Sequence, residues 1–367
     1  MENKSLKIVL VSTPIGYIGS GKGGGVELTL ISLIKGLLNL GNEIVLIAPY
    51  GSKLPSDCKR VEIKHFSGEE QPSWQHQEFS SPVIVPLNGV LPKLWEEALR
   101  LGKEADVILN FGYDWLPLWL TTQVEQKIFH LISMGAESKV IKDLINDISK
   151  THHKRLAFHS YNQASDYDLA ISPIVVGNGF DLRNYDFSKE YGGPLGWAGR
   201  ISPEKGLEDA VAVAEKLGES IFVWGLIEDT AYAEQVEKSF PAGTINWRGF
   251  LNTLEFQKEL GACRALINTP KWNEAYGNVV VESLACGVPV ISYNRGGPGE
   301  LISSGITGWL VEPDSIEELI SFTKRVEEID RTVCREWVEK SASYKVFARR
   351  IDCWLREGIH ENGIKRS

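Results

Sequence analysis

Short apolar segments alternate with helical patterns along almost the whole chain, and this alternation restricts the fold more than any other feature. Residues 6–12, LKIVLVS, are typical of a buried strand, and residues 26–40 have the spacing of an amphipathic helix that ends at Gly41. Residues 43–49, EIVLIAP, then predict a second strand, which completes a βαβ unit. Parallel strands connected in this way need helices on both faces of their sheet, so we predict an α/β fold.

A second series of the same kind follows the first. In the first half, further strands are expected at residues 105–112, 127–133 and 167–172. A passage rich in Pro, Gly and Asn then interrupts the pattern. It restarts with short apolar segments at residues 195–200, 220–225, 244–249, 264–270, 288–293 and 308–313. We therefore predict two α/β domains in one chain, with a cleft between them.

The predicted domains are residues 1–172 and residues 173–340. Apolar side chains recur at helical spacing between Ser341 and Leu355. An amphipathic helix must cover an apolar surface, so we expect a last helix, at about residues 341–360, to fold back across the first domain.

Charge and composition argue against several classes of partner. The 367 residues carry a formal net charge of −9, whereas nucleic-acid-binding proteins usually present a basic face. No apolar run approaches the roughly 18 residues that cross a bilayer, so we expect no transmembrane segment. The five cysteines are scattered without a CxxC pair, as in a reduced cytosolic protein. We predict a cytoplasmic protein that binds no nucleic acid, and its oligomeric state stays open.

A run of glycines between Gly19 and Gly25 lies after the first predicted strand and leads into the first predicted helix. It satisfies G-x-G-x-x-G, but the second strand ends without the acidic residue that a dinucleotide site needs. A P-loop does not fit either, because Lys22 is followed by Gly23 instead of Ser or Thr. Glycines let backbone amides approach a ligand closely, so the loop predicts another kind of ligand cradle, with a purely structural turn as the alternative.

The second half carries the most specific pattern. Arg200 and Lys205 follow a predicted strand in WAGRISPEKG. Glu274 and Glu282 stand eight residues apart around a Gly-Asn helix start in EAYGNVVVE, and we expect them on one helix, two turns apart and pointing to one side. With VVGNGFD before them and ACGVPVIS, GGPGELI and GITGWLVEP after them, these segments stand in one order. In that order they resemble the retaining glycosyltransferases of family four, glycosyl transferases group 1, of the sucrose-synthase and glycogen-synthase type. The resemblance covers nearly the whole chain and is strongest over residues 174–313.

The resemblance implies a GT-B architecture: two Rossmann-like domains, an interdomain cleft and a C-terminal helix that crosses back. It also implies a nucleotide-sugar donor, with Arg200 and Lys205 on the diphosphate and Glu274 near the sugar hydroxyls as the catalytic set. The other donor contacts that we predict are Gly24, Gly25, Tyr276, Gly277, Asn278, Val279 and, on the ribose, Glu282.

Elementary chemistry agrees with this assignment. An arginine fork and a lysine point charge both suit a diphosphate, and a helix N-terminus near Gly277 favours the same anion. Two cations and backbone amides can stabilise a leaving group without a metal. The chain has no DxD motif, so we predict metal-independent transfer with no cofactor besides the nucleotide sugar. In such retaining transferases a donor phosphate oxygen is thought to take the acceptor proton, so no protein nucleophile is expected.

The acceptor site is less well defined. The family often has a histidine where this chain has Phe111 to Asp114. We predict that Gly23, Tyr113, Asp114 and His130 contact the acceptor. A solvated loop acid at Asp114 and a buried strand histidine at His130 remain alternatives. Aromatic side chains in nearby loops, Trp74 and Trp115 among them, suit a sugar or a planar heterocycle.

Residues 11–30 also resemble the opening of bacterial pteridine glucosyltransferases, through the early proline, the glycine run and GVELTL. This resemblance implies UDP-glucose as donor and a pteridine such as tetrahydrobiopterin as acceptor. Balanced charges in the first domain also favour a small soluble acceptor. The alternatives are a hexosyltransferase of cell-surface polysaccharide or glycolipid synthesis, a nucleotide-sugar epimerase and a non-catalytic nucleotide-sugar binder.

Overall fold

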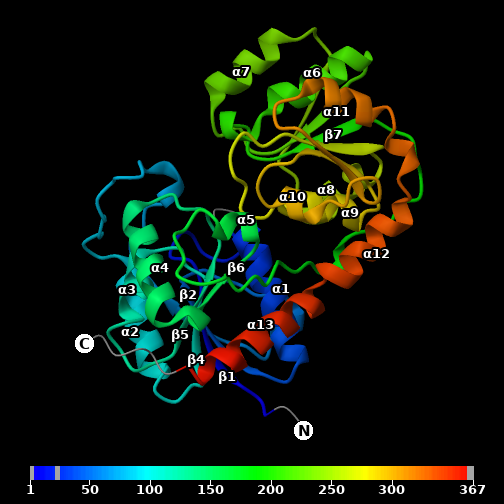
Figure 1. The fold of residues 1–367 in the computed structure, drawn as a ribbon. Coiled ribbons are helices and arrows are strands. Elements are labelled where there is room, and N and C mark those ends of the chain that lie inside the picture. Colours follow the sequence, from blue (N-terminus) through cyan, green and yellow to red (C-terminus); the bar gives the residue numbers. More distant parts are fainter. Residues whose placement is uncertain (1–3, 21–24, 362–367) are drawn as a thin grey trace. The chain divides into compact units, whose positions relative to one another are not determined.

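The computed structural model describes residues 4–20 and 25–361. The chain forms two compact units, Met1–Phe180 with Tyr344–Ser367 (unit 1) and Asp181–Ser343 (unit 2). Each unit is built on one parallel six-stranded sheet with helices on both faces (Figure 1). The predicted α/β class with two domains of the same type is therefore confirmed.

The sheet of unit 1 has the order β3-β2-β1-β4-β5-β6. Its strands are β1 (Lys7–Val11), β2 (Glu43–Pro49), β3 (Glu62–Phe66), β4 (Val107–Asn110), β5 (Ile128–Ile132) and β6 (Leu156–Phe158). Alternate residues of β1 face opposite sides: Ile8 and Leu10 join one hydrophobic cluster, and Val9 and Val11 join another. The apolar run in the sequence is therefore continuous because both faces of the strand are covered.

Helices cover both faces of this sheet. On one face, α1 (Gly25–Asn39) and α13 (Tyr344–Ile359) pack together with Ile8 and Leu10. The other helices of unit 1 are α2 (Val90–Leu101), α3 (Trp115–Leu120), α4 (Lys139–Thr151) and α5 (Tyr161–Ala164). The last helix of the chain therefore folds back on unit 1, as predicted. A Cβ placed on Gly36 of α1 would lie 2.3 Å from the Cβ of Ala348, so this glycine allows the close approach of α1 and α13.

The sheet of unit 2 has the order β12-β11-β10-β7-β8-β9. Its strands are β7 (Leu195–Ala198), β8 (Ile221–Trp224), β9 (Ile245–Gly249), β10 (Ala265–Asn268), β11 (Val290–Tyr293) and β12 (Gly308–Val311). Its helices are α6 (Leu207–Leu217), α7 (Thr230–Ser239), α8 (Thr253–Gly261), α9 (Asn278–Ala285), α10 (Pro298–Leu301), α11 (Ile316–Thr323) and α12 (Arg331–Ser341). Each strand predicted in the second half of the sequence is present in the structure.

Two strands of unit 1 differ from the prediction. The prediction of a strand at residues 167–172 is wrong, because this segment has no regular structure and Ile171 within it is exposed. The edge position belongs to β6, where Phe158 pairs with Val175 in an isolated bridge. The opposite edge strand, β3, was not predicted, because its sequence EIKHF is half polar and only partly buried.

Unit 1 continues to Phe180, beyond the boundary that the sequence placed at residue 172. The backbone explains this extension, since Val176 donates to the carbonyl of Phe158 at 2.9 Å. At the other end of the segment, Tyr344 at the start of α13 donates to the carbonyl of Phe180 at 2.9 Å.

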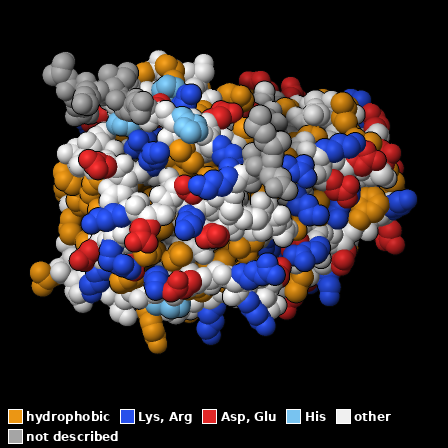
Figure 2. Space-filling view, turned by 90° about the horizontal axis from the view of Figure 1, so that it is seen from below, with side chains coloured by type: hydrophobic (Ala, Val, Ile, Leu, Met, Phe, Trp, Pro, Cys, Tyr) orange, Lys and Arg blue, Asp and Glu red, His pale blue; other side chains and the backbone are white. Residues whose placement is uncertain are grey.

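Acidic and basic side chains are interspersed over the face shown in Figure 2. Ion pairs between neighbours on one helix occur in both units, for example Lys139 with Asp143 on α4 and Lys340 with Glu336 on α12. Among the described residues, no helix is both long enough and apolar enough to cross a bilayer.

Candidate functional site

The candidate site lies in unit 2, where several parallel strands end. Ligands of open α/β sheets bind outside the carboxyl ends of the strands. Arg200 follows β7, and Lys205 ends a short 3₁₀ turn, η5 (Pro203–Lys205), in the same connection. Glu274 lies in the loop after β10, which leads to α9. The fold thus brings the three predicted catalytic residues to one edge of one sheet.

Lys205 and Glu274 form an ion pair with largely buried side chains, which are 16% and 22% exposed. Trp272 completes this group. Its Nε1 donates to Oε2 of Glu274 at 3.1 Å, and the Nζ of Lys205 lies 4.8 Å from the centre of its ring. The indole therefore touches both charged groups and restricts where they can move.

The pKa of Glu274 is lower than that of an ordinary glutamate. Burial alone would raise the pKa, but the charge and hydrogen bond of Lys205 outweigh burial, with smaller contributions from Trp272 and Arg200. Glu274 is therefore an anion at neutral pH and a hydrogen-bond acceptor, as a contact for sugar hydroxyls requires.

Arg200 is held by two further carboxylates, neither of which was predicted from the sequence. Its Nη2 lies 3.2 Å from Glu204, four residues along the chain. Its Nη1 contacts Glu228, which follows β8. The i,i+4 spacing could have indicated Glu204, but no local pattern indicates Glu228, because a different strand carries it to Arg200.

Helix α9 begins at this same edge. Gly277 precedes its first residue, Asn278, and has a φ of 97°, which only glycine adopts easily. A Cβ at this position would also lie 2.9 Å from Pro298. The first amides of the helix, which include Asn278 and Val279, point out of its N-terminus, and the helix dipole favours an anion there. Tyr276 is buried, 7% exposed, and its backbone packs on Gly297.

The expectation that Glu274 and Glu282 lie on one helix is wrong. Helix α9 starts at Asn278, so only Glu282 belongs to it, and Glu274 lies in the preceding loop. Glu282 has a separate partner, Tyr185, whose hydroxyl donates to Oε1 at 2.9 Å. Burial raises the pKa of Glu282 to about 7, although the Tyr185 hydrogen bond opposes this rise.

This pKa predicts a pH dependence of stability for Glu282. The pKa of about 7 belongs to the folded state, and the ordinary value is 4.5. Protonation of Glu282 therefore stabilises the folded state. This stabilisation is complete below pH 4.5 and is lost as the pH rises through 7. Glu282→Gln keeps an acceptor for Tyr185 without the charge. We expect the variant to gain on the order of 3 kcal/mol over the wild type between pH 5 and pH 8 in urea unfolding. A constant difference across this range would show that Glu282 titrates normally.

In unit 1, part of the predicted glycine site lies outside the described residues, namely Gly23 and Gly24. Gly25 is the first residue of α1. Glu27, in the first turn of this helix, was not predicted from the sequence. Its carboxylate accepts from the Gly19 amide at 2.7 Å and from the Ser20 hydroxyl at 3.1 Å. This glutamate therefore ties the start of the glycine run to the helix that follows it.

Tyr113 and Asp114 are buried in unit 1. The hydroxyl of Tyr113 donates to the carbonyl of Gly135 at 2.8 Å, and its side chain packs in a hydrophobic cluster. Asp114 is fully buried and accepts from the Trp115 amide at the start of α3. Burial raises the pKa of Asp114 to about 7, although the Trp115 amide and the Trp74 side chain oppose this rise. Neither side chain is exposed to an acceptor in this structure, and Asp114 is not a solvated loop acid.

His130 is likewise enclosed, within β5. Thr121 Oγ1 donates to the carbonyl of Pro117, so it accepts the Nε2 proton of His130 at 2.6 Å. The Nδ1 of His130 then accepts from Asn110 at 3.1 Å. Burial, with a smaller contribution from the charge of Arg155, lowers the pKa of His130 to about 3, so the ring stays neutral. These bonds favour the alternative of a buried strand histidine over acceptor contact.

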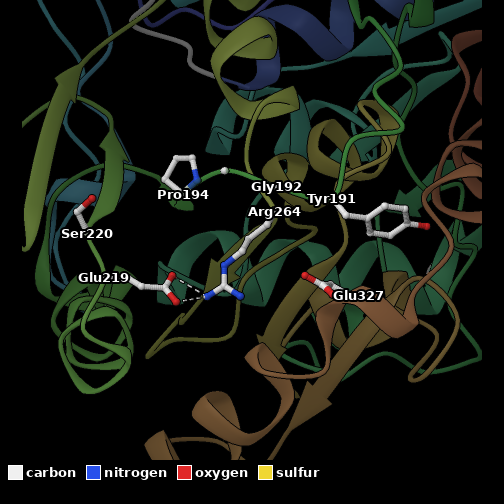
Figure 3. Close-up of a pocket in the computed structure, with 8 residues that line it drawn as sticks. Tyr191, Gly192, Pro194, Glu219, Ser220, Arg264 and Glu327 are labelled. Carbon is white, nitrogen blue, oxygen red and sulfur yellow. Dashed lines mark hydrogen bonds and ion pairs between the residues drawn. The ribbon is translucent and has the colours of Figure 1, made fainter.

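A hollow of about 490 Å³ lies elsewhere on unit 2 (Figure 3). Pro194, Ser220 and Arg264 line it, and each directly precedes a strand, β7, β8 or β10. It therefore lies at the amino ends of the strands, away from Arg200 and Lys205. The Nη2 of Arg264 donates to both oxygens of Glu219, at 2.7 and 2.6 Å, so the positive charge at this hollow is already paired with a carboxylate.

Residues 195–344 match the family model described as "Glycosyl transferases group 1". The sulfoquinovosyl transferase SQD2 of Arabidopsis thaliana is 28% identical over 182 residues, which are 45% of this chain and 35% of that protein. The glycogen synthase of Mycobacterium tuberculosis is 28% identical over 162 residues, 41% of this chain and 39% of the synthase. The chain thus matches little more than a third of the length of either relative.

Solved structures resemble the chain over almost its full length. Anabaena Alr3699/HepE, crystallised in complex with UDP and glucose, aligns with a TM-score of 0.70 at 17% identity and covers 96% of this chain and 99% of its own. AviGT4, a glycosyltransferase involved in avilamycin A biosynthesis, aligns with a TM-score of 0.71 at 18% identity over 98% of this chain and 100% of its own. The fold is therefore that of the GT-B glycosyltransferases.

Together these findings define the class. Residues 195–344 form a glycosyltransferase domain of group 1, which confirms the predicted enzyme class at the level of this domain. The predicted motif residues Arg200, Lys205, Glu274 and Glu282 all fall inside it. Within the described ranges, 4–20 and 25–361, no three His, Cys, Asp or Glu side chains are grouped so that they could hold a metal ion.

Proposed function

We propose that the protein is a retaining glycosyltransferase that uses a nucleotide sugar, UDP-glucose, to glycosylate a small soluble acceptor, a pteridine such as tetrahydrobiopterin. One observation carries the proposal. Arg200 and Lys205 meet Glu274 at the carboxyl edge of the unit 2 sheet, where α9 begins. A diphosphate suits two cations and a helix N-terminus, and a sugar hydroxyl suits a carboxylate.

In this proposal the residues act on charge that develops at the leaving group. As the bond from the sugar to the diphosphate breaks, the leaving phosphate gains negative charge, which Arg200, Lys205 and the first amides of α9 stabilise. A donor phosphate oxygen takes the proton of the acceptor hydroxyl on the same face of the sugar. The products are the glycosylated acceptor with retained configuration and UDP. Glu282 binds the ribose, and Glu274 orients the sugar.

The proposals for the acceptor and for the cellular compartment rest on other features of the chain. Residues 11–30 resemble the opening of pteridine glucosyltransferases, and this supports the pteridine. Alr3699/HepE was crystallised with UDP and glucose, which supports a UDP-glucose donor here by analogy. All five cysteines are free thiols, as expected in a reducing compartment, so we propose a cytoplasmic enzyme.

Mass spectrometry of a transfer reaction tests the proposal. The purified protein is incubated with UDP-glucose, reduced biopterin and a panel of other small acceptors. A hexose adduct on the pterin supports donor, acceptor and reaction together. Release of UDP without a pterin adduct would retain the transferase and refute the pteridine. An absence of both product and nucleotide binding would refute the transferase.

The proposed chemistry needs no metal, so EDTA should leave the transfer rate unchanged. Arg200 and Lys205 supply the charge that a divalent cation would otherwise supply at the leaving diphosphate. The check is the initial rate with and without a prior incubation in an excess of EDTA over protein. A loss of more than about tenfold that Mg²⁺ or Mn²⁺ restores would contradict the metal-free mechanism.

A further inference from the structure

We propose that Trp272 is a positioning residue of the donor site, which holds one oxygen of Glu274 so that the other accepts a hydrogen bond from the donor sugar. The proposal rests on the proposed function, since it assumes that Glu274 contacts the sugar. It adds a residue that sets the affinity for the sugar part of the donor and not for its nucleotide part.

Two donors meet at the same oxygen of Glu274. The Nζ of Lys205 and the Nε1 of Trp272 both donate to Oε2, the indole at 3.1 Å. Oε1 takes part in neither contact, and the side chain of Glu274 is 22% exposed, so solvent reaches part of it. An ionised carboxylate accepts at both oxygens, so Oε1 remains for a hydroxyl of the ligand.

A lysine alone positions a carboxylate poorly. Its ammonium sits on a flexible stem and has three equivalent donors, which permit many geometries. The indole is rigid and donates from a single N–H, so it fixes the direction from which the carboxylate accepts. The Nζ of Lys205 also lies over the ring of Trp272, 4.8 Å from its centre, within the range of a cation–π attraction. One side chain therefore holds both members of the ion pair.

The backbone of this loop is anchored on both sides of Trp272. The Lys271 amide donates to the carbonyl of Glu204 at 2.8 Å, on the turn η5. The carbonyl of Glu274 accepts from the Gly297 amide at 2.7 Å. Between these anchors, the Glu274 amide donates to the carbonyl of Trp272 at 3.1 Å, so the two residues share one tight turn. Only rotation of the side chains is left, and the bond from the indole to the carboxylate restricts it.

Isothermal titration calorimetry of the full chain with UDP-glucose and UDP tests the role. Trp272→Phe keeps an aromatic ring beside Lys205 and removes the indole donor. Glu274 should then present Oε1 less accurately, so the variant should bind UDP-glucose about three- to tenfold more weakly than wild type. UDP has no sugar and should bind the variant within about twofold of wild type.

The matched control is Trp247→Phe, elsewhere in unit 2. Trp247 lies on β9 and is partly buried, as Trp272 is, and its ring packs on the hydrophobic cluster of this unit. Its Nε1 also donates to a carboxylate, that of Glu237 on α7. The control therefore removes the same kind of hydrogen bond without touching Glu274, and it should bind both ligands as wild type does.

The pH dependence of UDP-glucose binding is a second readout. Burial raises the pKa of Glu274, and Lys205, Trp272 and Arg200 lower it. The two cations both come from the connection after β7, and Gly296, which packs on the backbone of Glu274 after β11, brings no charge. Without the indole bond the pKa should rise, so binding should be lost at a higher pH on acidification. A loss of ring packing alone would leave this pH unchanged.

The possible failures are distinguishable. If Trp272→Phe binds UDP-glucose as wild type does, or more weakly but without the pH shift, the positioning role is wrong and the proposed function stands. The role is also wrong if the variant loses affinity for UDP and UDP-glucose alike, if Trp247→Phe loses as much, or if wild type binds UDP but not UDP-glucose. If wild type binds none of UDP-glucose, UDP, ADP and GDP, the proposed function fails and the positioning role falls with it.

Discussion

Replacement of Lys205 by alanine is expected to lower the rate of sugar transfer at least about 100-fold while the protein remains folded. Lys205 carries one of the two cations at the proposed leaving group, and its side chain is only 16% exposed, so water replaces its charge poorly. The loss should appear mainly in kcat, because negative charge on the diphosphate increases as the bond breaks. UDP binding should weaken less, since Arg200 and the N-terminus of α9 remain.

The same substitution changes Glu274. Without Lys205, burial of Glu274 is no longer offset by its strongest partner, so its pKa should rise. The matched control is Lys238→Ala on α7, a lysine that is 75% exposed and pairs with Glu234. Steady-state transfer kinetics with UDP-glucose compare the turnover of the two variants, and circular dichroism checks that both are folded. A folded Lys205→Ala protein with turnover within a factor of about three of the control would refute the role of Lys205 at the leaving group.

The sequence indicated the sheets well wherever strands are buried on both faces. Short apolar runs between helical segments form β1, β7 and β11. Such short, continuous apolar runs are typical of strands that are buried on both faces. The pattern failed at the edges of unit 1. β3 is half polar because one edge is open to water, and β6 has only three residues, too short to stand out from its surroundings.

The candidate site shows a similar division. Lys205 and Glu274 could be found because their motifs are local, and the fold then brought them into contact. Glu228 and Tyr185 could not be found in this way, since each reaches its partner, Arg200 or Glu282, from a distant part of the chain. His130 shows the converse problem. A buried histidine with two neutral partners and a histidine that contacts a ligand look the same in sequence.

The return of the last helix to unit 1 leads to the second large prediction, which concerns stability. Trp354 of α13 is 3% exposed and makes two contacts with segments far away in the sequence. Its ring packs edge-on against Phe129 of β5 with centroids 5.4 Å apart, and its Nε1 donates to the carbonyl of Lys154 at 2.6 Å. Trp354→Ala should therefore lower the free energy of unfolding of unit 1 by about 3–5 kcal/mol.

Two companion variants separate the loss of the ring packing from the loss of the hydrogen bond. Trp354→Phe keeps an aromatic ring beside Phe129 but removes the donor, so the carbonyl of Lys154 loses its partner and the loss should be about 1–3 kcal/mol. Arg349→Ala, at an exposed position of the same helix, should cost less than about 0.5 kcal/mol. Urea unfolding followed by far-UV circular dichroism ranks the three. If Trp354→Ala were as stable as Arg349→Ala, α13 would contribute little to unit 1. The apolar spacing that predicted this helix would then reflect helix formation alone, without the packing on β5 that the structure shows.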